Sequence, residues 1–330
     1  MRIACYHLNQ VGDLAFSLPA LKCIRDAFPD AVVTSVARPG MVELLGCSGL
    51  VDEVLVRRGG LNAAKIGLIR SLRQRRFDLA IVFSQSAECA VLAYLSGAPK
   101  RIGFINTSLG ILLTRRVEFS HPPSTENNLR LVSEAGCGIT CRDYVGLLKP
   151  TDALIERGER ILGENGIMPD QPVVALSPGT SGRRSVKEWS DEGFAEVGRH
   201  LIARGYRVVV LGTQPASGIV AACDAITDLS GKTNLGEALA ILSRSRALVA
   251  VDSGILHLAA AAGTKVVGLY GPSNPKITGP RGEGHVIVTS GEDCSPCVRT
   301  ECKFDRKCMT NIDARRVIEA VDSVLHVERQ

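Results

Sequence analysis

The chain has 330 residues, of which 45% are hydrophobic and 22% charged, with a formal net charge of +5. This length exceeds one ordinary core and predicts two domains of about 150 residues each, while the composition excludes a disordered chain. The basic excess is too small to indicate a nucleic-acid partner. No stretch reaches the roughly 18 uncharged apolar residues of a membrane helix, and Met1–His7 has the pattern of a strand rather than of a signal peptide. We therefore expect a cytoplasmic protein with mostly reduced thiols, for which attachment to a membrane surface stays open.

In the first half of the chain, short apolar runs alternate with segments of helical period, which is typical of a parallel sheet covered by helices. The predicted strands are Ile3–His7, Ala31–Val36, Glu53–Val56, Leu79–Phe83 and Arg101–Phe104. The predicted helices lie near residues 14–28, 39–46, 61–76, 86–95 and 126–136. This alternation indicates a first doubly wound domain.

The same pattern restarts after a predicted linker helix at residues 152–165. The further predicted strands are Val173–Ser177, Arg207–Leu211, Ala247–Val251 and Lys265–Tyr270. The further predicted helices lie near residues 191–204, 216–225, 234–245 and 254–262, and a last one at 313–327 is free to pack back on either domain, the first included. The sequence therefore predicts an α/β protein with two Rossmann-like domains, residues 1–150 and 151–330. Ligands of such folds bind at the carboxyl ends of the strands, so we expect the site in a cleft between the domains.

The strongest local signal is the run Asp252-Ser253-Gly254-Ile255-Leu256-His257, where a buried strand turns directly into an Ala-rich helix. The first amides of a helix lack internal partners and carry the positive end of its dipole, so they can hold a phosphate. Gly254 permits close backbone approach, and Asp252 and His257 project at the same edge. The alternative is that Asp252 only caps the helix and that His257 is a satisfied core histidine. A second glycine-rich loop after the next strand, Tyr270–Pro275, favours a binding site.

Residues 177–190 follow the first strand of this domain and therefore lie at the same sheet edge. Lys187 is a candidate counter-charge for a diphosphate leaving group. The alternative is a basic loop in which Ser190 caps the next helix, and the two roles do not exclude each other. Trp189, the only tryptophan, is expected to pack rather than to bind ligand. The residues whose hydroxyl or amide groups suit phosphate oxygens are Ser177, Gly179 and Thr180.

The matching loop of the first domain, residues 8–14, contains Gly12-Asp13 directly after the opening strand. A carboxylate at this edge could take a proton from an incoming hydroxyl as a general base. The alternative is that Asp13 caps the following helix, a role that Ser17 could fill equally well.

The segment 57–76 carries seven basic residues and no acidic one. A solvated helix face is the usual explanation for such a run. Its density equally favours an anionic acceptor or membrane headgroups. The candidate acceptor contacts are Arg57, Arg58 and Lys65.

Four cysteines lie close together near the end of the chain: Cys294, Cys297, Cys302 and Cys308. Such a quartet could bind zinc or an iron–sulfur cluster, pair as disulfides or stay free. The spacing fits neither a zinc ribbon nor the plant-type ferredoxin order, so we expect structural thiols and no bound metal.

Several motifs appear in a fixed order along the chain. They are Gly12-Asp13 with Leu18-Pro19-Ala20, Ser177-Pro178-Gly179 with Lys187-Glu188-Trp189, the run Asp252–Ala261, Gly271-Pro272, and Cys294-Ser295-Pro296-Cys297. In this order the sequence resembles the heptosyltransferase family of lipopolysaccharide core assembly, from Arg2 to about Val324. The resemblance implies the GT-B architecture, with two Rossmann-like domains facing a central cleft. It also implies a metal-independent sugar transfer that inverts the anomeric centre.

Carried over by position, the resemblance implies that Asp13 is the base that activates the acceptor hydroxyl. Lys187 and the Thr180 loop would meet the donor phosphates, and Asp252 would contact the sugar hydroxyls. The residues that would surround the diphosphate are Ser253, Gly254 and His257. The donor would be a nucleotide-sugar, with ADP-heptose as the first choice and no bound cofactor. The acceptor would be an anionic glycolipid, and its negative charges would explain the basic residues of the first domain.

One departure from the family pattern concerns the donor ribose. Family members carry an acidic residue after the strand that corresponds to Arg207–Leu211, whereas here the loop reads Gly212-Thr213-Gln214-Pro215-Ala216. Gln214 could substitute, so the choice of nucleotide stays open. Two other classes also stay open: a sugar-nucleotide epimerase or hydrolase on the same scaffold, and a non-catalytic two-lobed binding protein. A nicotinamide dehydrogenase fits poorly because neither first loop contains Gly-x-Gly-x-x-Gly.

Overall fold

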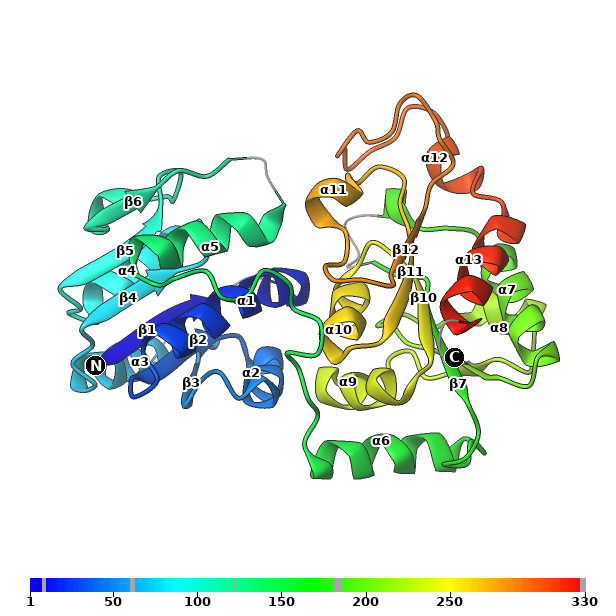
Figure 1. The fold of residues 1–330 in the computed structure, drawn as a ribbon, viewed down its shortest axis with the longest axis horizontal. Coiled ribbons are helices and arrows are strands. Elements are labelled where there is room, and N and C mark those ends of the chain that lie inside the picture. Colours follow the sequence, from blue (N-terminus) through cyan, green and yellow to red (C-terminus); the bar gives the residue numbers. More distant parts are fainter. Residues whose placement is uncertain (8–9, 60–62, 121–122, 181–184, 327–330) are drawn as a thin grey trace. The chain divides into compact units, whose positions relative to one another are not determined.

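The computed structural model describes residues 1–7, 10–59, 63–120, 123–180 and 185–326. The chain divides into two compact units, Met1–Tyr144 and Val145–Gln330, which we call the N-terminal and the C-terminal unit. Each unit has its own parallel sheet, with helices on both faces (Figure 1). The expected α/β fold with two Rossmann-like domains is confirmed.

In the described part of the N-terminal unit, six parallel strands form the sheet in the order β3-β2-β1-β4-β5-β6. They are β1 (Arg2–His7), β2 (Val32–Ala37), β3 (Glu53–Val56), β4 (Leu79–Val82), β5 (Lys100–Phe104) and β6 (Arg115–Val117). All of β1 after Arg2 is buried, as expected of a central strand in a sheet covered on both faces. The order reverses between β1 and β4, and in doubly wound sheets this reversal is where ligands bind.

Helices cover both faces of this first sheet. They are α1 (Val11–Ala27), α2 (Val42–Ser48), α3 (Ala63–Gln74), α4 (Ala87–Leu95) and α5 (Ser124–Glu134), with short 3-10 turns η1 (Pro39–Met41) and η2 (Gly110–Leu112). One face is packed by α3 and α4, whose Leu72 and Leu92 join a core with Tyr6 of β1. Helices α1 and α5 lie against each other, and the side-chain amide of Asn128 donates to the carbonyl of Phe16 at 2.9 Å.

The C-terminal unit repeats this topology. In its described residues, six parallel strands have the order β12-β11-β10-β7-β8-β9, which is the first sheet read from the opposite edge. They are β7 (Val173–Ser177), β8 (Arg207–Val210), β9 (Thr227–Asp228), β10 (Ala247–Val251), β11 (Lys265–Leu269) and β12 (Val286–Val288). The reversal here falls between β7 and β10.

The helices of the C-terminal unit are α6 (Asp152–Glu164), α7 (Asp191–Ala203), α8 (Ser217–Ala222), α9 (Leu235–Arg244), α10 (Gly254–Ala262), α11 (Pro275–Thr278), α12 (Lys307–Thr310) and α13 (Ala314–His326), with the 3-10 turn η3 at Ser185–Lys187. Figure 1 shows α9 and α10 on one face of the sheet and α7, α8 and α13 on the other. Helix α13 buries Val317 and Val321 in the core of this unit, and its Asp322 pairs with His200 of α7 and with Arg204, the residue that follows α7. The last helix, which the sequence left free to join either domain, therefore packs on the second sheet.

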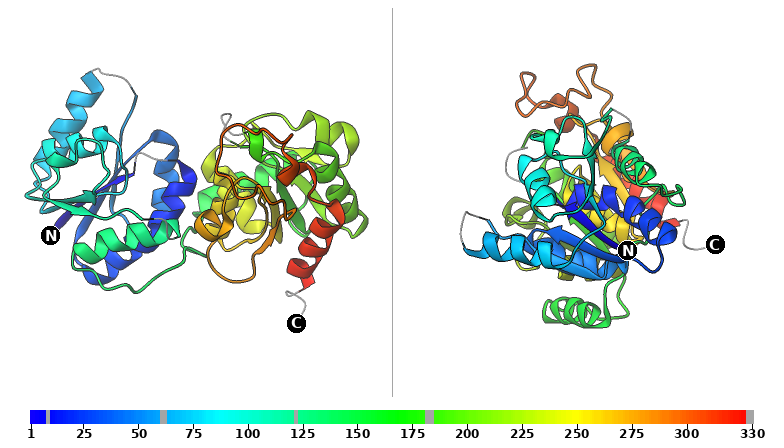
Figure 2. Two further views of the ribbon diagram at one scale, coloured as in Figure 1. Left: turned by 90° about the horizontal axis from the view of Figure 1, so that it is seen from above. Right: turned by 90° about the vertical axis from the view of Figure 1, so that its left-hand side faces the viewer.

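Differences from the predicted elements are confined to short edge elements and one helix start. The edge strands β6, β9 and β12 and the short helices α11 and α12 were not expected from the sequence. Helix α1 begins at Val11, earlier than predicted, and runs through Pro19. Between β12 and α12, residues 289–306 form an irregular loop that extends out from the unit (orange to red in Figures 1 and 2).

Candidate functional site

The carboxyl ends of β7 and β10 lie side by side where the second sheet reverses its order. Ser177, the last residue of β7, is in register with Ala250 of β10. Two residues separate β10 from helix α10, which begins at Gly254 and ends at Ala262, and the C-cap Gly263 has a φ of +91°, a conformation that L side chains rarely adopt. The predicted strand–turn–helix is therefore confirmed, and the free amides of the first turn of α10 lie at this edge.

Lys187, Asp252 and His257 form a charged cluster at this edge. Lys187 Nζ lies 2.5 Å from Asp252 Oδ2, and His257 Nε2 lies 3.8 Å from Asp252 Oδ1. The side chains of Lys187 and Asp252 are only 11% and 8% exposed, so each charge depends on its partner. The alternative role of Asp252 as the helix cap is wrong, because the N-cap of α10 is Ser253.

The ionisation of Asp252 follows from this cluster. Burial alone would raise the pKa of Asp252, but the neighbouring His257 ring and the Lys187 ammonium outweigh burial and hold the pKa well below its usual range. Asp252 is therefore a carboxylate at neutral pH. It keeps the Lys187 ammonium in place at the strand ends, where an anionic ligand would compete for it.

Several hydroxyl groups near this edge are buried and lack hydrogen-bond partners. Among the described residues, no partner exists for the side-chain oxygens of Ser177, Thr180, Ser230 and Ser253. A buried polar atom left unpaired costs about 1–3 kcal/mol, so a group of them calls for a ligand or water that pairs with them. Three of the four are residues that the sequence assigns to donor binding, whereas Ser230, which follows β9, was missed.

The remaining donor candidates differ in exposure. Gly179 is half-buried, and Gln214 is exposed. Residues 181–184 of the loop that follows Gly179 lie outside the described residues.

The loop that carries Gln214 is held by a carboxylate from the neighbouring strand. Asp228 accepts the backbone N–H groups of Ala216 and Ser230 at 2.9 Å each. A carboxylate is thus present in this region, but both of its oxygens are used by the backbone.

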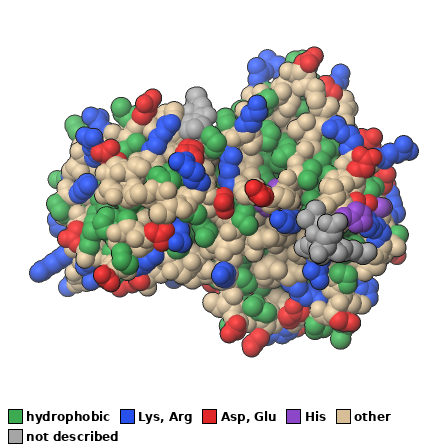
Figure 3. All heavy atoms as spheres, viewed as in Figure 1, with side chains coloured by type: hydrophobic (Ala, Val, Ile, Leu, Met, Phe, Trp, Pro, Cys, Tyr) green, Lys and Arg blue, Asp and Glu red, His purple; other side chains and the backbone are tan. Residues whose placement is uncertain are grey.

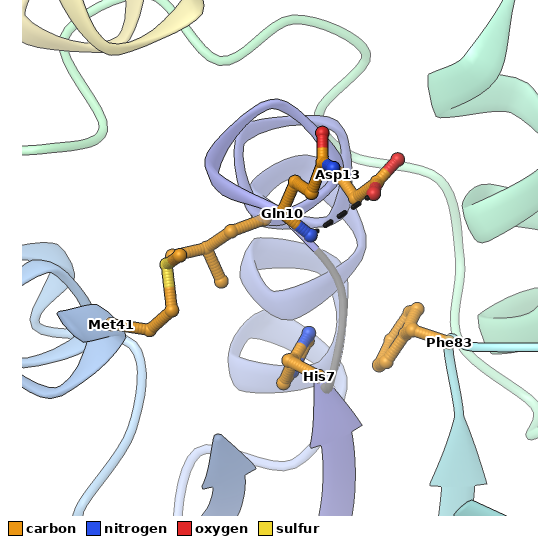
Figure 4. A pocket seen from close by; sticks show the side chains of 6 residues that line it. His7, Gln10, Asp13, Met41 and Phe83 are labelled. Atoms are coloured by element: carbon orange, nitrogen blue, oxygen red, sulfur yellow. Dashed lines mark hydrogen bonds between the residues drawn. The ribbon is translucent and has the colours of Figure 1, made fainter. Parts of the chain in front are cut away.

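Asp13 lies at the corresponding edge of the first sheet, in the first turn of α1 (Figure 4). Its side chain is exposed, and its Oδ2 accepts the backbone N–H of Gln10 at 3.2 Å. The N-cap of α1 is Gln10 and not Asp13, but Asp13 does help to cap the helix, because its carboxylate completes a capping box with Gln10. The alternative cap, Ser17, is wrong: it lies inside the helix with its hydroxyl donating to the carbonyl of Leu14. Residues 8–9 of the predicted loop lie outside the described residues.

Two cavities of the N-terminal unit share Asp13 and Phe83 in their walls. The larger has a volume of about 520 Å³ and combines three aromatic rings with neutral polar groups. Its lining residues are Asp13, Phe16, Phe83, Ser84, Gln85, Ser86, Phe119, Ser124, Asn127 and Asn128. The smaller has a volume of about 10 Å³, about that of one water molecule, and is lined by His7, Gln10, Asp13, Leu14, Met41 and Phe83. Aromatic faces beside amides and hydroxyls suit a sugar ring.

Two of the three predicted acceptor cations form ion pairs within the unit. Arg57 and Lys65 both pair with Glu88 at the start of α4, Lys65 at 2.7 Å, whereas Arg58 is exposed. On the face shown in Figure 3, blue Lys and Arg side chains of the N-terminal unit are interspersed with red acidic ones rather than gathered in one patch.

Across the described residues, no helix has both the length and the apolar character needed to span a membrane.

All eleven cysteines are described residues, and none of them forms a disulfide. Cys302 accepts the backbone N–H groups of Phe304 and Arg306 at 3.3 Å each. Within the described ranges, no group of three or more His, Cys, Asp or Glu side chains is arranged to hold a metal ion. Trp189 packs as expected, donating from Nε1 to the carbonyl of Ile312, and Ser190 caps α7.

Solved structures place the fold among glycosyltransferases. A family 9 glycosyltransferase from Veillonella parvula aligns with 99% of this chain and 97% of its own at a TM-score of 0.86 and 21% identity. The ADP-heptose lipopolysaccharide heptosyltransferase II of Escherichia coli aligns with all of both chains at a TM-score of 0.82 and 23% identity. At these identities the likeness shows the fold.

The family model described as glycosyltransferase family 9 (heptosyltransferase) matches residues 66–308. The chain therefore belongs to this family, and the prediction of a sugar-transferring enzyme is confirmed. Among its curated relatives, lipopolysaccharide heptosyltransferase 2 of E. coli K12 is 28% identical over 298 residues, which cover 85% of each chain.

His7 is a site residue that sequence reasoning missed, although it ends the strand that precedes Gly12-Asp13. It is 4% exposed, its ring stacks on Phe83 with 4.7 Å between ring centroids, and its Nδ1 lies 3.2 Å from Ser17 Oγ. Burial lowers its pKa to about 3. The imidazole is therefore neutral in the folded protein at pH values at which an exposed histidine is protonated.

This burial predicts an acid-sensitive N-terminal unit. Between pH 6.5 and 3 the unfolded state binds a proton at His7 that the folded state does not. The free energy of unfolding therefore decreases as the pH is lowered, by up to about 1.4 kcal/mol per pH unit. We expect His7→Asn to flatten this dependence, as measured by urea denaturation from pH 7.5 to pH 5. Parallel pH curves for the variant and the wild type would contradict the prediction.

Proposed function

We propose that this enzyme transfers heptose from ADP-heptose to an anionic lipopolysaccharide core acceptor, with inversion at the anomeric carbon. The observation that carries this proposal is the edge of the second sheet. There, a buried lysine–carboxylate pair, the amides at the start of α10 and unpartnered hydroxyls come together. Family membership and the named activities of the relatives support the same reading.

In this proposal the C-terminal unit binds the donor. Lys187 and the amides of Ser253 and Gly254 neutralise the diphosphate, because an ammonium and a helix N-terminus both favour anions. Asp252 is then freed to accept hydrogen bonds from sugar hydroxyls, and His257 keeps it charged and oriented. The donor contacts are completed by Ser177, Gly179 and Thr180. Gln214 and Ser230 are our candidates for the ribose.

The N-terminal unit binds the acceptor. The cavity of about 520 Å³ offers hydroxyl and amide groups to sugar hydroxyls and aromatic rings to a sugar face. The acidic groups of the acceptor would be met by Arg57, Arg58 and Lys65. Because Glu88 already pairs with Arg57 and Lys65, these cations are held in place but only partly available.

The proposed reaction is a direct displacement. Asp13 accepts the proton of the acceptor hydroxyl, and the oxygen attacks the anomeric carbon from the face opposite the diphosphate. The bond from the anomeric carbon to the diphosphate breaks, and the negative charge that develops on the leaving group is stabilised by Lys187 and the α10 amides. No metal ion is needed in this scheme, so chelators should not inhibit transfer. We place the enzyme in the cytoplasm, with contact to the inner membrane surface where its lipid acceptor resides.

The donor assignment predicts selective stabilisation by adenine nucleotides. ADP-heptose at about 100 times its dissociation constant should stabilise the protein by about 2.7 kcal/mol in thermal-shift experiments, and UDP- and GDP-sugars should do so much less. Equal stabilisation by all three would contradict an adenine-specific site.

Transfer itself is tested with ADP-heptose and a purified lipid acceptor that lacks heptose, with and without EDTA. We expect ADP release only when the acceptor is present, and NMR of the product should show the inverted anomer. Donor consumption without acceptor would indicate the hydrolase or epimerase alternative. Tight nucleotide binding without turnover would indicate a binding protein.

A further inference from the structure

The imidazole of His7 offers an unused hydrogen-bond acceptor beside Asp13. Ser17 Oγ lies 2.7 Å from the carbonyl of Leu14 and 3.2 Å from His7 Nδ1. A hydroxyl has one proton, and the shorter contact assigns it to the carbonyl, which can only accept. The hydroxyl oxygen must then accept a hydrogen bond from Nδ1–H of His7. In a neutral imidazole with the proton on Nδ1, Nε2 carries a lone pair.

That lone pair is buried and unused. His7 is 4% exposed, and among the described residues its Nε2 has no hydrogen-bond partner. The low pKa of His7, about 3, agrees with a ring that stays neutral. The Phe83 ring stacks on one face of the imidazole, whereas the Nε2 lone pair lies in the plane of the ring.

The cavity that His7 lines has the size and chemistry of a water site. Its volume of about 10 Å³ is about the minimum that holds one water molecule, which also needs two to four polar partners. Among the described residues, the polar side chains that line it are those of His7, Gln10 and Asp13, and the other lining residues are apolar. Figure 4 shows His7 and Phe83 at the ends of their strands and Gln10 and Asp13 in the first turn of the helix beside them.

We propose that His7 is a positioning residue for Asp13, and that it acts through one buried water that donates to His7 Nε2 and to the Asp13 carboxylate. The inference rests on the proposed role of Asp13 as the base. Asp13 Oδ2 accepts the N–H of Gln10 at 3.2 Å, which is a long hydrogen bond. The hydrogen bond from the water restricts the carboxylate plane further and leaves a lone pair directed at the acceptor hydroxyl. Such orientation of a base raises kcat rather than substrate affinity.

Two substitutions separate this role from a structural one. In His7→Asn the amide nitrogen takes the place of Nδ1 and keeps the bond to Ser17, while the acceptor at the Nε2 position is lost. In His7→Gln the side-chain amide reaches the Nε2 position and can accept from the water, while the bond to Ser17 is lost.

We expect His7→Asn to lower kcat about tenfold with both KM values within about twofold, a loss equivalent to one hydrogen bond of about 1.4 kcal/mol. Its melting temperature at pH 7.5 should stay near that of the wild type. His7→Gln should keep kcat within about threefold of the wild type despite a lower melting temperature. The opposite order, with His7→Asn fully active and His7→Gln impaired in step with its stability, would overturn the proposal and leave His7 a structural residue.

A second readout does not depend on turnover. Nitrogen-15 NMR of histidine-labelled protein contains six histidines, and the His7 signal is the one that His7→Asn removes. We expect a proton on Nδ1 and a bare, hydrogen-bonded Nε2 from pH 5 to 8. A proton on Nε2 would refute the water bridge. If the wild type shows this tautomer but transfers no sugar, the proposed function fails while the His7 site stands; if it transfers sugar with the other tautomer, only the His7 inference fails.

Discussion

Asp13→Asn should lower kcat for sugar transfer between about 100- and 10,000-fold, which is the usual contribution of a general base. The substituted amide cannot accept the proton of the acceptor hydroxyl. Its oxygen can still accept the N–H of Gln10, as Asp13 Oδ2 does at 3.2 Å, so the start of α1 should remain intact. Donor affinity should not change, because the donor contacts we propose all lie in the other unit. The measurement is steady-state transfer at saturating donor, together with calorimetric titration of ADP.

Glu43→Gln is the matched control for this substitution. Glu43 is also an exposed acidic residue in the first turn of a helix of the same unit, and it lines neither of the cavities that contain Asp13. The control should retain wild-type kcat. If Asp13→Asn transferred sugar within a fewfold of the wild type, Asp13 would not be the base.

Lys187→Met is the second substitution with a large expected effect, and it should act on both stability and donor binding. It leaves the Asp252 carboxylate buried without its main counter-charge, which in buried pairs costs about 3 kcal/mol or more. It also removes a charged hydrogen-bond donor from the diphosphate, so we expect the dissociation constant of ADP to rise about 100-fold, or about 2.7 kcal/mol. Urea denaturation and ADP titration measure the two effects.

The partner substitution separates the two roles. Asp252→Asn removes the charge that competes for Lys187, so ADP should bind at least as tightly as to the wild type, whereas the sugar part of the donor should lose its contact. The double variant should be more stable than Lys187→Met alone, because no unpaired charge is then buried. Lys307→Met, at an exposed lysine of the same unit, is the control. Wild-type ADP affinity in Lys187→Met would exclude Lys187 from the diphosphate site.

Much of the fold could be predicted because its central strands are buried on both faces. Val173–Leu176 and Ala247–Val251 are unbroken apolar runs, and the turn into α10 follows from Gly254 and the alanines after it. The short strands β6, β9 and β12 could not be predicted, since two or three residues contain too little pattern to distinguish a strand from a loop. The start of α1 was misplaced because glutamine, the residue at its N-cap, is a weak capping signal.

The residues of the candidate site were easier to predict than the contacts between them. Lys187 and Asp252 each stood out from the local sequence, but their ion pair joins residues 65 positions apart. The same is true of Glu88, which pairs with two cations of a run that looked free of acidic partners. His7 could not be singled out at all, because its role depends on a tautomer that only the positions of Ser17 and Leu14 reveal.

One hydrophobic core cluster of the N-terminal unit includes Tyr6 and Leu72, and one of the C-terminal unit includes Val249 and Val321. Each of these clusters contains residues of one unit alone, so cooperativity need not extend over the whole chain. We therefore expect a melting curve with two transitions, and the melting temperature expected for the His7 variants is that of the N-terminal unit. A nucleotide would move only the transition of the C-terminal unit, whereas acidification through His7 would move only that of the N-terminal unit. Each transition can thus serve as a reference for the other. When a ligand or a substitution shifts one transition, the transition that does not shift identifies the unit that is unaffected.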